Sequence, residues 1–246
     1  MTSPRRLRSL AAVLCALTLP GCATLGYYAQ SVHGHLDVVW RAQPISRVID
    51  DPSTPVDLKA RLERVREIRD FATRELGLPD NGSYRSYADL HRPFVLWNVF
   101  AAPEFSVKPV ESCFPFAGCV TYRGFYDEQR ARDYATELHG RGLDTFVGGV
   151  PAYSTLGYFD DPVLNTFVNL PEPEVARLIF HELAHQVVYV RGDTVFNESF
   201  ATAVEEEGLQ RWLDRHGTSA QRDAWRAYQK RRREFVTLVE RYRGRL

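Results

Sequence analysis

The feature that most constrains this chain is the motif His181-Glu182-x-x-His185, followed by Glu198 in an Asn-Glu pair. On a helix, residues four apart lie on one face, so His181 and His185 can present two imidazoles to one metal ion. Glu182 stands beside that ion, and Glu198 can supply a third ligand from a following helix. Two nitrogens, one carboxylate oxygen and an open position for water describe a catalytic site for one Zn²⁺ ion.

The motif also predicts the roles of its neighbours. Bound Zn²⁺ lowers the pKa of a water ligand towards about 7. Glu182 points about 100° away from His181 on the helix, so it can flank that water and act as general base. A hydrogen-bond donor must stabilise the oxyanion, and Tyr153 is the first candidate, with Tyr189 as the alternative. The competing interpretation is that both histidines are hydrogen-bonded within a core.

Composition sets the class of protein. The 246 residues suit one domain, or two closely packed lobes, and 44% hydrophobic with 25% charged residues is typical of a globular protein. The formal net charge is zero, so nothing in the overall charge indicates a nucleic-acid partner.

The N-terminus has the pattern of an export signal. Arginines precede the short apolar run Leu10–Leu19, which is too short to span a bilayer as a permanent helix. The run ends in a sequence that resembles a bacterial lipobox, so we expect residues 1–21 to be a lipoprotein signal peptide and Cys22 to carry the lipid. The alternative is ordinary secretion with cleavage near Ala23.

Two cysteines, Cys113 and Cys119, remain in the mature chain. Pro115 and Gly118 favour a turn between them. In an oxidising compartment we expect these cysteines to form a disulfide. The alternative, a cysteine pair that binds metal, lacks further cysteines or a nearby histidine to complete the ligand set.

Hydrophobic periodicity and turn residues predict an α+β fold, with a small mixed or antiparallel sheet packed on helices. We expect residues 22–55 to be a tether and irregular lead-in, and residues 56–246 to form a single domain. The expected helices are Asp57–Leu76, Asp127–His139, Pro173–Val190, a helix capped by Asp193 or Thr194 that ends at Gly217, and a last helix from about Ala220. The expected strands are Phe94–Ala101, Ala117–Phe125 and Asp144–Val150, with Ala152–Tyr158 continuing the last one.

The motif and the following Asn197-Glu198-x-Phe200-Ala201 resemble the gluzincin metallopeptidases, in which both histidines and the later glutamate bind zinc. The closer likeness is to a family of zinc aminopeptidases that occur as lipoproteins in Gram-negative bacteria. Its matching stretches here include Ala152–Gly157, Phe180–Gln186 and Phe196–Ala201. The resemblance implies gluzincin-like helices, a peptide substrate, and an edge strand near 149–157 that pairs with that substrate.

These expectations place the protein in the bacterial cell envelope, anchored to the membrane through Cys22 and facing the periplasm. Ala23 after the lipidated cysteine suggests the outer membrane. Two alternative functions stay open, a catalytically inactive zinc-binding envelope lipoprotein and a zinc amidase that acts on cell-wall peptides. The first would close the fourth metal position with protein, whereas a catalytic site keeps water there.

The C-terminal region from Arg211 to Leu246 is basic, with eleven Lys or Arg against four Asp or Glu. A basic amphipathic helix can lie on anionic lipid. We favour the other interpretation, a solvated face on a helix that packs through its aromatic stripe.

Overall fold

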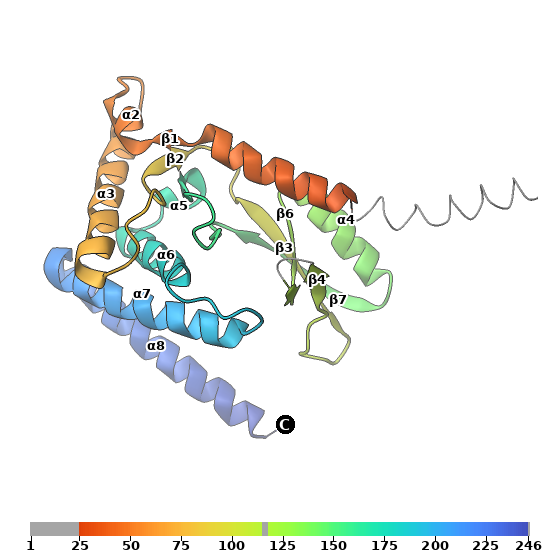
Figure 1. Cartoon of the computed structure of the whole chain (residues 1–246). Coiled ribbons are helices and arrows are strands. Elements are labelled where there is room, and N and C mark those ends of the chain that lie inside the picture. The colour runs from red at the N-terminus through yellow and green to blue at the C-terminus, as the bar shows by residue number, and fades with distance from the viewer. Residues whose placement is uncertain (1–24, 115–117, 246) are drawn as a thin grey trace, which may run out of the picture. The chain divides into compact units, whose positions relative to one another are not determined.

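The computed structural model describes residues 25–114 and 118–245, which fall into two compact units that interleave along the chain (Figure 1). Unit 1 contains the residues up to 42, 88–152 and 164–166, and unit 2 contains 43–87, 153–163 and 167–246. Helices and small sheets of two or three strands confirm the α+β fold class. The expected signal peptide 1–21 and Cys22 lie outside the described residues, and the single domain expected over 56–246 stays a prediction.

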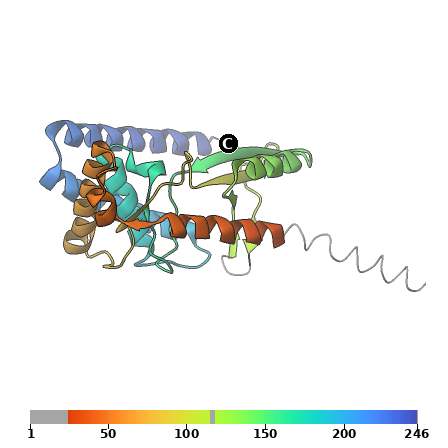
Figure 2. The same cartoon turned by 90° about the horizontal axis from the view of Figure 1, so that it is seen from above.

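Unit 1 is built on a three-stranded antiparallel sheet. Its central strand β3 (Leu96–Pro103) pairs with β6 (Arg123–Phe125) on one side and β7 (Leu143–Val150) on the other. Alternate residues of β3 are buried, as expected of a strand with one covered face. Helix α4 (Glu128–His139) packs along this sheet, and Asp127 caps its N-terminus (Figures 1 and 2). The buried residues that the sheet and α4 share are Trp97, Val99, Ala101, Phe125, Ala131, Ala135 and Leu138.

Residues 25–41 are helical, so the irregular lead-in expected there was wrong. Tyr27 packs against the core between the sheet and α4, and the Arg123 guanidinium lies 4.0 Å from its ring centroid. A Cβ on Gly34 would lie 2.1 Å from Cγ of Tyr126. This glycine therefore permits close packing of the helix against Tyr126. The first proline of the segment, Pro44, comes after the helix.

The disulfide expected between Cys113 and Cys119 is present. It joins the two strands of a hairpin, β4 (Ser112–Phe114) and β5 (Gly118–Val120), in which Cys113 and Cys119 are directly opposite. The short hairpin therefore holds the pair in register for the bond.

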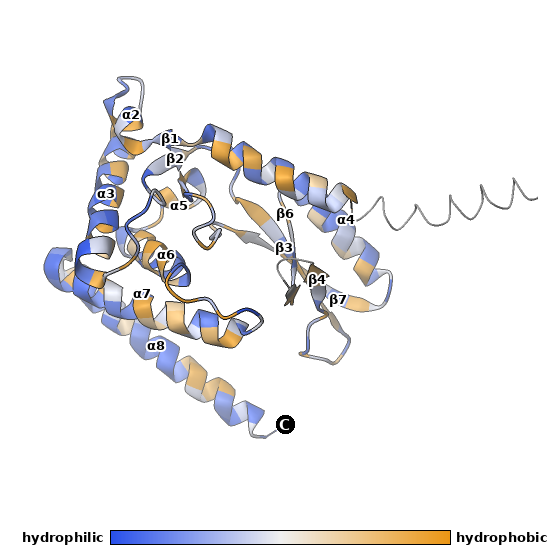
Figure 3. Ribbon diagram, in the orientation of Figure 1, coloured by the Kyte–Doolittle hydropathy of each residue, from blue (hydrophilic) through white to orange (hydrophobic). Residues whose placement is uncertain are grey.

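Unit 2 is mainly helical. Its long helices are α3 (Val56–Leu76), α6 (Glu172–His185), α7 (Thr194–His216) and α8 (Ser219–Arg243), and α2 (Ile45–Asp50) precedes them. The Phe71 ring of α3 lies 6.0 Å from Phe180 of α6 and 5.2 Å from Trp212 of α7, measured between centroids. Figure 3 shows the hydrophobic residues of these helices. A Cβ on Gly208 of α7 would lie 2.9 Å from Phe180, so glycine allows α7 to approach α6 closely.

Short elements complete the chain. β1 (Gln43–Pro44) pairs antiparallel with β2 (Ser86–Ala88). β8 (Val163–Leu164) and α5 (Asn165–Val168) lie where the chain passes between the units. None of the helices within 25–114 and 118–245 has the length and hydrophobicity needed to cross a bilayer.

The strand expected over 152–158 is absent, and only the residues up to Val150 of the expected edge strand belong to β7. Leu156 and Gly157 have φ angles of 56° and 81°. A strand requires negative φ, so the chain turns here, and the Tyr158 N–H donates to the carbonyl of Thr155.

Candidate metal centre

Helix α6 carries the two histidines of the motif. Glu172 and Glu174 lie in its first turn, where carboxylates favour the positive end of the helix dipole. His181 and His185 follow one another on one side of the helix, with ring centroids 4.8 Å apart. The other face of α6 is buried in the core of unit 2 and carries Val175, Ala176, Ile179, Phe180, Leu183 and Ala184. The apolar face therefore fixes the helix and leaves the histidines at the boundary of the core.

Helix α6 ends at His185, about one turn before Val190, where the sequence predicted its end. The side chain of Asn197 explains this earlier end. The buried Asn197 side chain accepts from the Val190 N–H at 2.7 Å and donates to the Val190 carbonyl at 2.8 Å. Those backbone groups are satisfied without continuing the helix. The same side chain sits near the start of α7, so it fixes the connection between the helices and the position of Glu198, the next residue.

The three predicted ligands come together. His181 Nε2 lies 3.2 Å from His185 Nε2 and 3.4 Å from Glu198 Oε2, and His185 Nε2 lies 3.7 Å from Glu198 Oε1. A tetrahedral Zn²⁺ with bonds of about 2.0–2.1 Å separates its ligand atoms by about 3.3–3.4 Å. The first two distances are close to this separation, and the third, to the other Glu198 oxygen, is somewhat longer, so the donor set fits a zinc ion. The Glu198 side chain is 57% exposed, which leaves the centre open to solvent on that side.

A second carboxylate of α7, Glu205, holds the far side of the His181 ring. Its Oε2 lies 2.8 Å from His181 Nδ1, and its side chain is only 14% exposed. This contact favours a proton on Nδ1 and turns the lone pair of Nε2 towards Glu198 and His185. Carboxylate–histidine pairs of this kind orient metal ligands and raise their basicity.

The two histidines differ in their electrostatic surroundings. Burial acts to lower the pKa of His181, but the hydrogen bond with Glu205 and the nearby carboxylates outweigh it, so the pKa is raised. Burial lowers the pKa of His185, and the neighbouring His181 lowers it further. His185 Nδ1 is buried and has no hydrogen-bond partner within the described part of the chain. His185 therefore favours the neutral form, which is the form that binds metal.

A buried arginine, Arg69, holds the loop before β2 beside the end of α6. Its guanidinium donates to the carbonyls of Ser83 at 2.8 Å and Pro79 at 2.6 Å. In this loop Asn81 Nδ2 donates to Gln186 Oε1 at 2.7 Å, and Gln186 directly follows His185. The network thus links α3 to the end of the motif helix.

The loop 153–163 is fixed to the same region of unit 2. The Asp161 N–H donates to Ser83 Oγ at 3.3 Å, and the Asp161 carbonyl accepts from the Tyr84 N–H at 2.6 Å. Asp161 Oδ2 accepts from the Thr155 N–H at 3.0 Å. Asp161 is buried, so it serves as an internal anchor of this loop.

A comparison with protein families gives a match over residues 26–246 to the family described as Putative aminopeptidase. The chain belongs to this family. No curated protein and no solved structure matches the chain. Membership of the family indicates a peptidase-like function.

In this member of the Putative aminopeptidase family, Glu182 has the titration expected of a base. Burial raises the pKa of Glu182 to about 7, and the carboxylates of Asp161, Glu198 and Glu205 contribute, while His181 acts in the opposite direction. A base whose pKa lies near the working pH is both available and able to accept a proton.

Three tyrosines lie near these groups. The buried Tyr84 hydroxyl, whose pKa is raised well above 10 mainly by burial, interacts electrostatically with Glu182 and with Tyr153. It has no hydrogen-bond partner within residues 25–114 and 118–245. The half-exposed Tyr189 ring lies 6.4 Å from that of His185, measured between centroids. Both expected oxyanion donors therefore lie in the same unit as the motif.

Sequence reasoning missed two of these residues. Glu205 lies seven positions after Glu198, two helical turns on the same face, so helical spacing could have indicated it. Tyr84 belongs to no motif, and only the fold brings it near Glu182.

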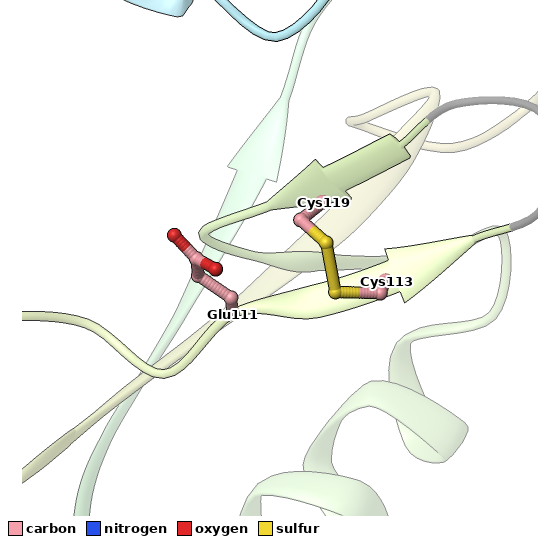
Figure 4. A group of neighbouring side chains, drawn as sticks. All are labelled: Glu111, Cys113 and Cys119. Carbon is pink, nitrogen blue, oxygen red and sulfur yellow. A yellow bond between two sulfur atoms is a disulfide. The ribbon is translucent and has the colours of Figure 1, made fainter.

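A second group of possible metal ligands, Glu111 with Cys113 and Cys119, lies on the hairpin of unit 1 (Figure 4). The two sulfur atoms are bonded to each other, so neither can act as a thiolate ligand. The three residues are exposed. This group therefore does not compete with the centre on α6.

Proposed function

We propose that this protein is a zinc-dependent peptidase, with aminopeptidase activity, in which His181, His185 and Glu198 hold one Zn²⁺ ion. The observation that carries the proposal is the cluster of ligand atoms, with His181 Nε2 3.2 Å from His185 Nε2 and 3.4 Å from Glu198 Oε2, and His185 Nε2 3.7 Å from Glu198 Oε1. Family membership supports a peptide substrate. When bound, the ion supplies a Lewis acid that polarises the scissile carbonyl and lowers the pKa of a water ligand.

The residues of the chain supply the proton transfers. Glu182 accepts a proton from the attacking water on its carboxylate and returns it to the leaving amine. A pKa of about 7 lets the same group act in both directions near neutral pH. Glu205 keeps the His181 ring in the orientation that exposes Nε2.

We propose Tyr153 as the donor that stabilises the oxyanion. The loop that carries it is anchored through Asp161 to Ser83, and its hydroxyl interacts with Tyr84 near Glu182. Removing one such donor costs about 10²–10³ in kcat. Tyr153→Phe should show this loss with KM little changed, and Tyr189→Phe is the matched variant. A loss confined to Tyr189→Phe would transfer the role to that residue.

The proposal is tested by measuring bound metal and peptide cleavage for the wild type and Glu182→Gln. The variant should bind zinc with unchanged stoichiometry and lose about 10²–10⁴ in turnover, the usual contribution of a general base. Glu174→Gln, in the first turn of the same helix, controls for the loss of a carboxylate. Unchanged turnover in Glu182→Gln would refute the assigned role.

A substrate panel separates the related functions. Peptides with a free α-amine should be cleaved faster than N-blocked peptides if the protein is an aminopeptidase. Preferential cleavage of cell-wall peptides would instead indicate a zinc amidase. Stoichiometric zinc with no cleavage of any peptide would indicate an inactive zinc-binding lipoprotein.

We also propose that the protein is anchored through a lipid on Cys22, faces the periplasm and resides in the outer membrane. The support is the signal-like sequence 1–21 and the disulfide between Cys113 and Cys119, a bond typical of exported proteins. Membrane fractionation of wild type and Cys22→Ser after a high-salt wash tests this proposal, because the wash removes proteins held by charge alone, so the variant should leave the membrane fraction and the wild type should stay in it.

A further inference from the structure

The C-terminal half of α8 carries a continuous apolar stripe that the described chain leaves uncovered. Phe235 is 65% exposed and Tyr242 55%, and Leu238 and Val239 are 46% and 40% exposed. Figure 3 shows hydrophobic residues recurring along the C-terminal half of α8. Isolated exposed apolar residues are common on soluble proteins, but a contiguous stripe of large ones marks a surface for interaction.

The first half of α8 shows what a packed stretch of this helix looks like. Trp225 is 5% exposed and stacks on Tyr228, over whose ring the Arg177 guanidinium of α6 lies at 5.4 Å. Arg232 forms an ion pair with Glu206 of α7. The residues that follow are exposed, so the expectation that the helix packs through its whole aromatic stripe was wrong beyond this point.

The stripe has the spacing of one helix face. At about 100° per residue, Leu238, Tyr242, Phe235 and Val239 fall within an arc of about 100°. Residues 230–243 make a helix of about 21 Å at 1.5 Å per residue. This length suits a helix that lies flat in a bilayer interface and is too short to cross a bilayer.

The charge around the stripe is strongly positive. Residues 230–245 contain seven arginines or lysines and two glutamates, although the whole chain has 31 basic and 31 acidic residues. Arg231 lies inside the apolar arc, Arg232 and Arg243 lie within about 40° of its edges, and Arg245 follows the end of the helix. Glu240 points away from the arc, and Glu234 lies 3.9 Å from Lys230. Arginine stems can extend along apolar surface while their charged ends reach phosphate groups.

We propose that residues 230–245 form a surface that binds an anionic lipid bilayer, with Phe235, Leu238, Val239 and Tyr242 in the interface and the arginines on lipid phosphates. The combination of an apolar face with flanking cations decides in favour of lipid, because either feature alone would suit other partners. This surface is independent of the metal centre and of the lipid proposed at Cys22.

The test measures binding of the full chain to vesicles, with Cys22→Ser in every protein so that no attached lipid contributes. Vesicles of phosphatidylglycerol and phosphatidylcholine are compared with pure phosphatidylcholine by co-sedimentation at low and high salt. We expect binding to the anionic vesicles that weakens as salt rises, because exposed charges are screened. Binding at equal strength to neutral vesicles, or none to anionic ones, would overturn the proposal.

Two sets of variants assign the binding to this surface. Arg231→Gln with Arg243→Gln should weaken binding about 30-fold, since each cation near an anionic membrane contributes about fivefold. Phe235→Ser with Leu238→Ser should weaken it at least about tenfold. Matched controls are Phe105→Ser, at a residue 98% exposed, and Arg74→Gln, whose side chain is 76% exposed.

The substituted residues of α8 and the two control residues are exposed, so thermal unfolding should show that each variant keeps the fold. Controls that weaken binding as much as the α8 variants would refute the assignment. Sedimentation of the protein without vesicles tests whether a second copy of the chain covers the stripe instead. A dimer that Phe235→Ser with Leu238→Ser abolishes, in a protein that ignores anionic vesicles, would show that a second copy covers the stripe and would overturn the proposal.

Discussion

The contact between Glu205 and His181 makes a quantitative prediction about metal affinity. The 2.8 Å contact joins a nearly buried carboxylate to Nδ1 of His181, the ring nitrogen that is not the proposed metal ligand. Outer carboxylates of this kind change metal affinity about 10–100-fold, which is about 1.4–2.7 kcal/mol. Glu205→Ala removes the contact, so we expect about a 100-fold loss. Glu205→Gln keeps a neutral acceptor for the His181 ring. Because charge-assisted hydrogen bonds are about twice as strong as neutral ones, we expect this variant to lose about tenfold in zinc affinity.

Competition with a chromophoric zinc chelator at pH 7.5 measures these affinities. Glu207→Gln is the matched control, because Glu207 lies on the same helix, has a 61% exposed side chain and pairs with the exposed Arg211. Thermal unfolding of the metal-free proteins checks that Glu205→Ala keeps its fold after losing the neighbour of Arg177, which lies 3.4 Å from Glu205.

The outcome separates the orienting role from simple packing. The order of zinc affinity should be wild type and Glu207→Gln, then Glu205→Gln, then Glu205→Ala, with Glu198→Ala weakest because it removes a ligand. If both Glu205 variants bound zinc within about twofold of the wild type while Glu198→Ala lost affinity, the reasoning about His181 would be refuted.

Three further predictions concern stability. Arg69→Leu leaves buried carbonyls without a donor and should lower the free energy of unfolding by about 3 kcal/mol in urea, against no change for Arg74→Gln. Burial raises the pKa of Asp161 above its ordinary value of 3.8, so the folded state binds a proton more tightly than the unfolded chain does. The resulting stabilisation of the folded state is fully present below about pH 3.8 and is lost as pH rises through the folded pKa. Asp161→Asn should therefore flatten the pH dependence of unfolding over that window, and an unchanged profile would contradict the assignment. Replacing Cys113 and Cys119 by serine should cost about 2 kcal/mol, the entropy of closing a seven-residue loop, by the same measurement.

Much of the candidate site could be predicted because its geometry is local. The spacing of His181 and His185 fixes their relation on any helix. Asp193, one of the two residues predicted as the cap of α7, accepts from the Phe196 N–H. The distance of Glu198 from the histidines, by contrast, depends on how α6 and α7 pack. The sequence could only suggest that the three residues meet, and the structure brings them together.

The errors arose where tertiary contacts override local signals. Apolar residues continue past His185, and this pattern predicted a longer α6, yet Val187 and Tyr189 are about half exposed. The side chain of Asn197 satisfies the backbone of Val190 from a later helix, which no local pattern could show. The helix over 25–41, where the sequence predicted an irregular lead-in, likewise depends on a distant contact, because Gly34 packs against Tyr126, 92 positions away.

The connection between α6 and α7 explains why Asn197 and Glu198 are adjacent. Asn197 binds the backbone of Val190 and so sets where α7 begins relative to the end of α6. Glu198 then faces Nε2 of His181, and Glu205, two turns later, reaches Nδ1 of the same ring. One helix thus supplies both a proposed metal ligand and the group that orients another proposed ligand. Because both contacts depend on where α7 begins, a shift of that start would move Glu198 and Glu205 together. The Asn197 amide opposes such a shift through its two hydrogen bonds to the backbone of Val190.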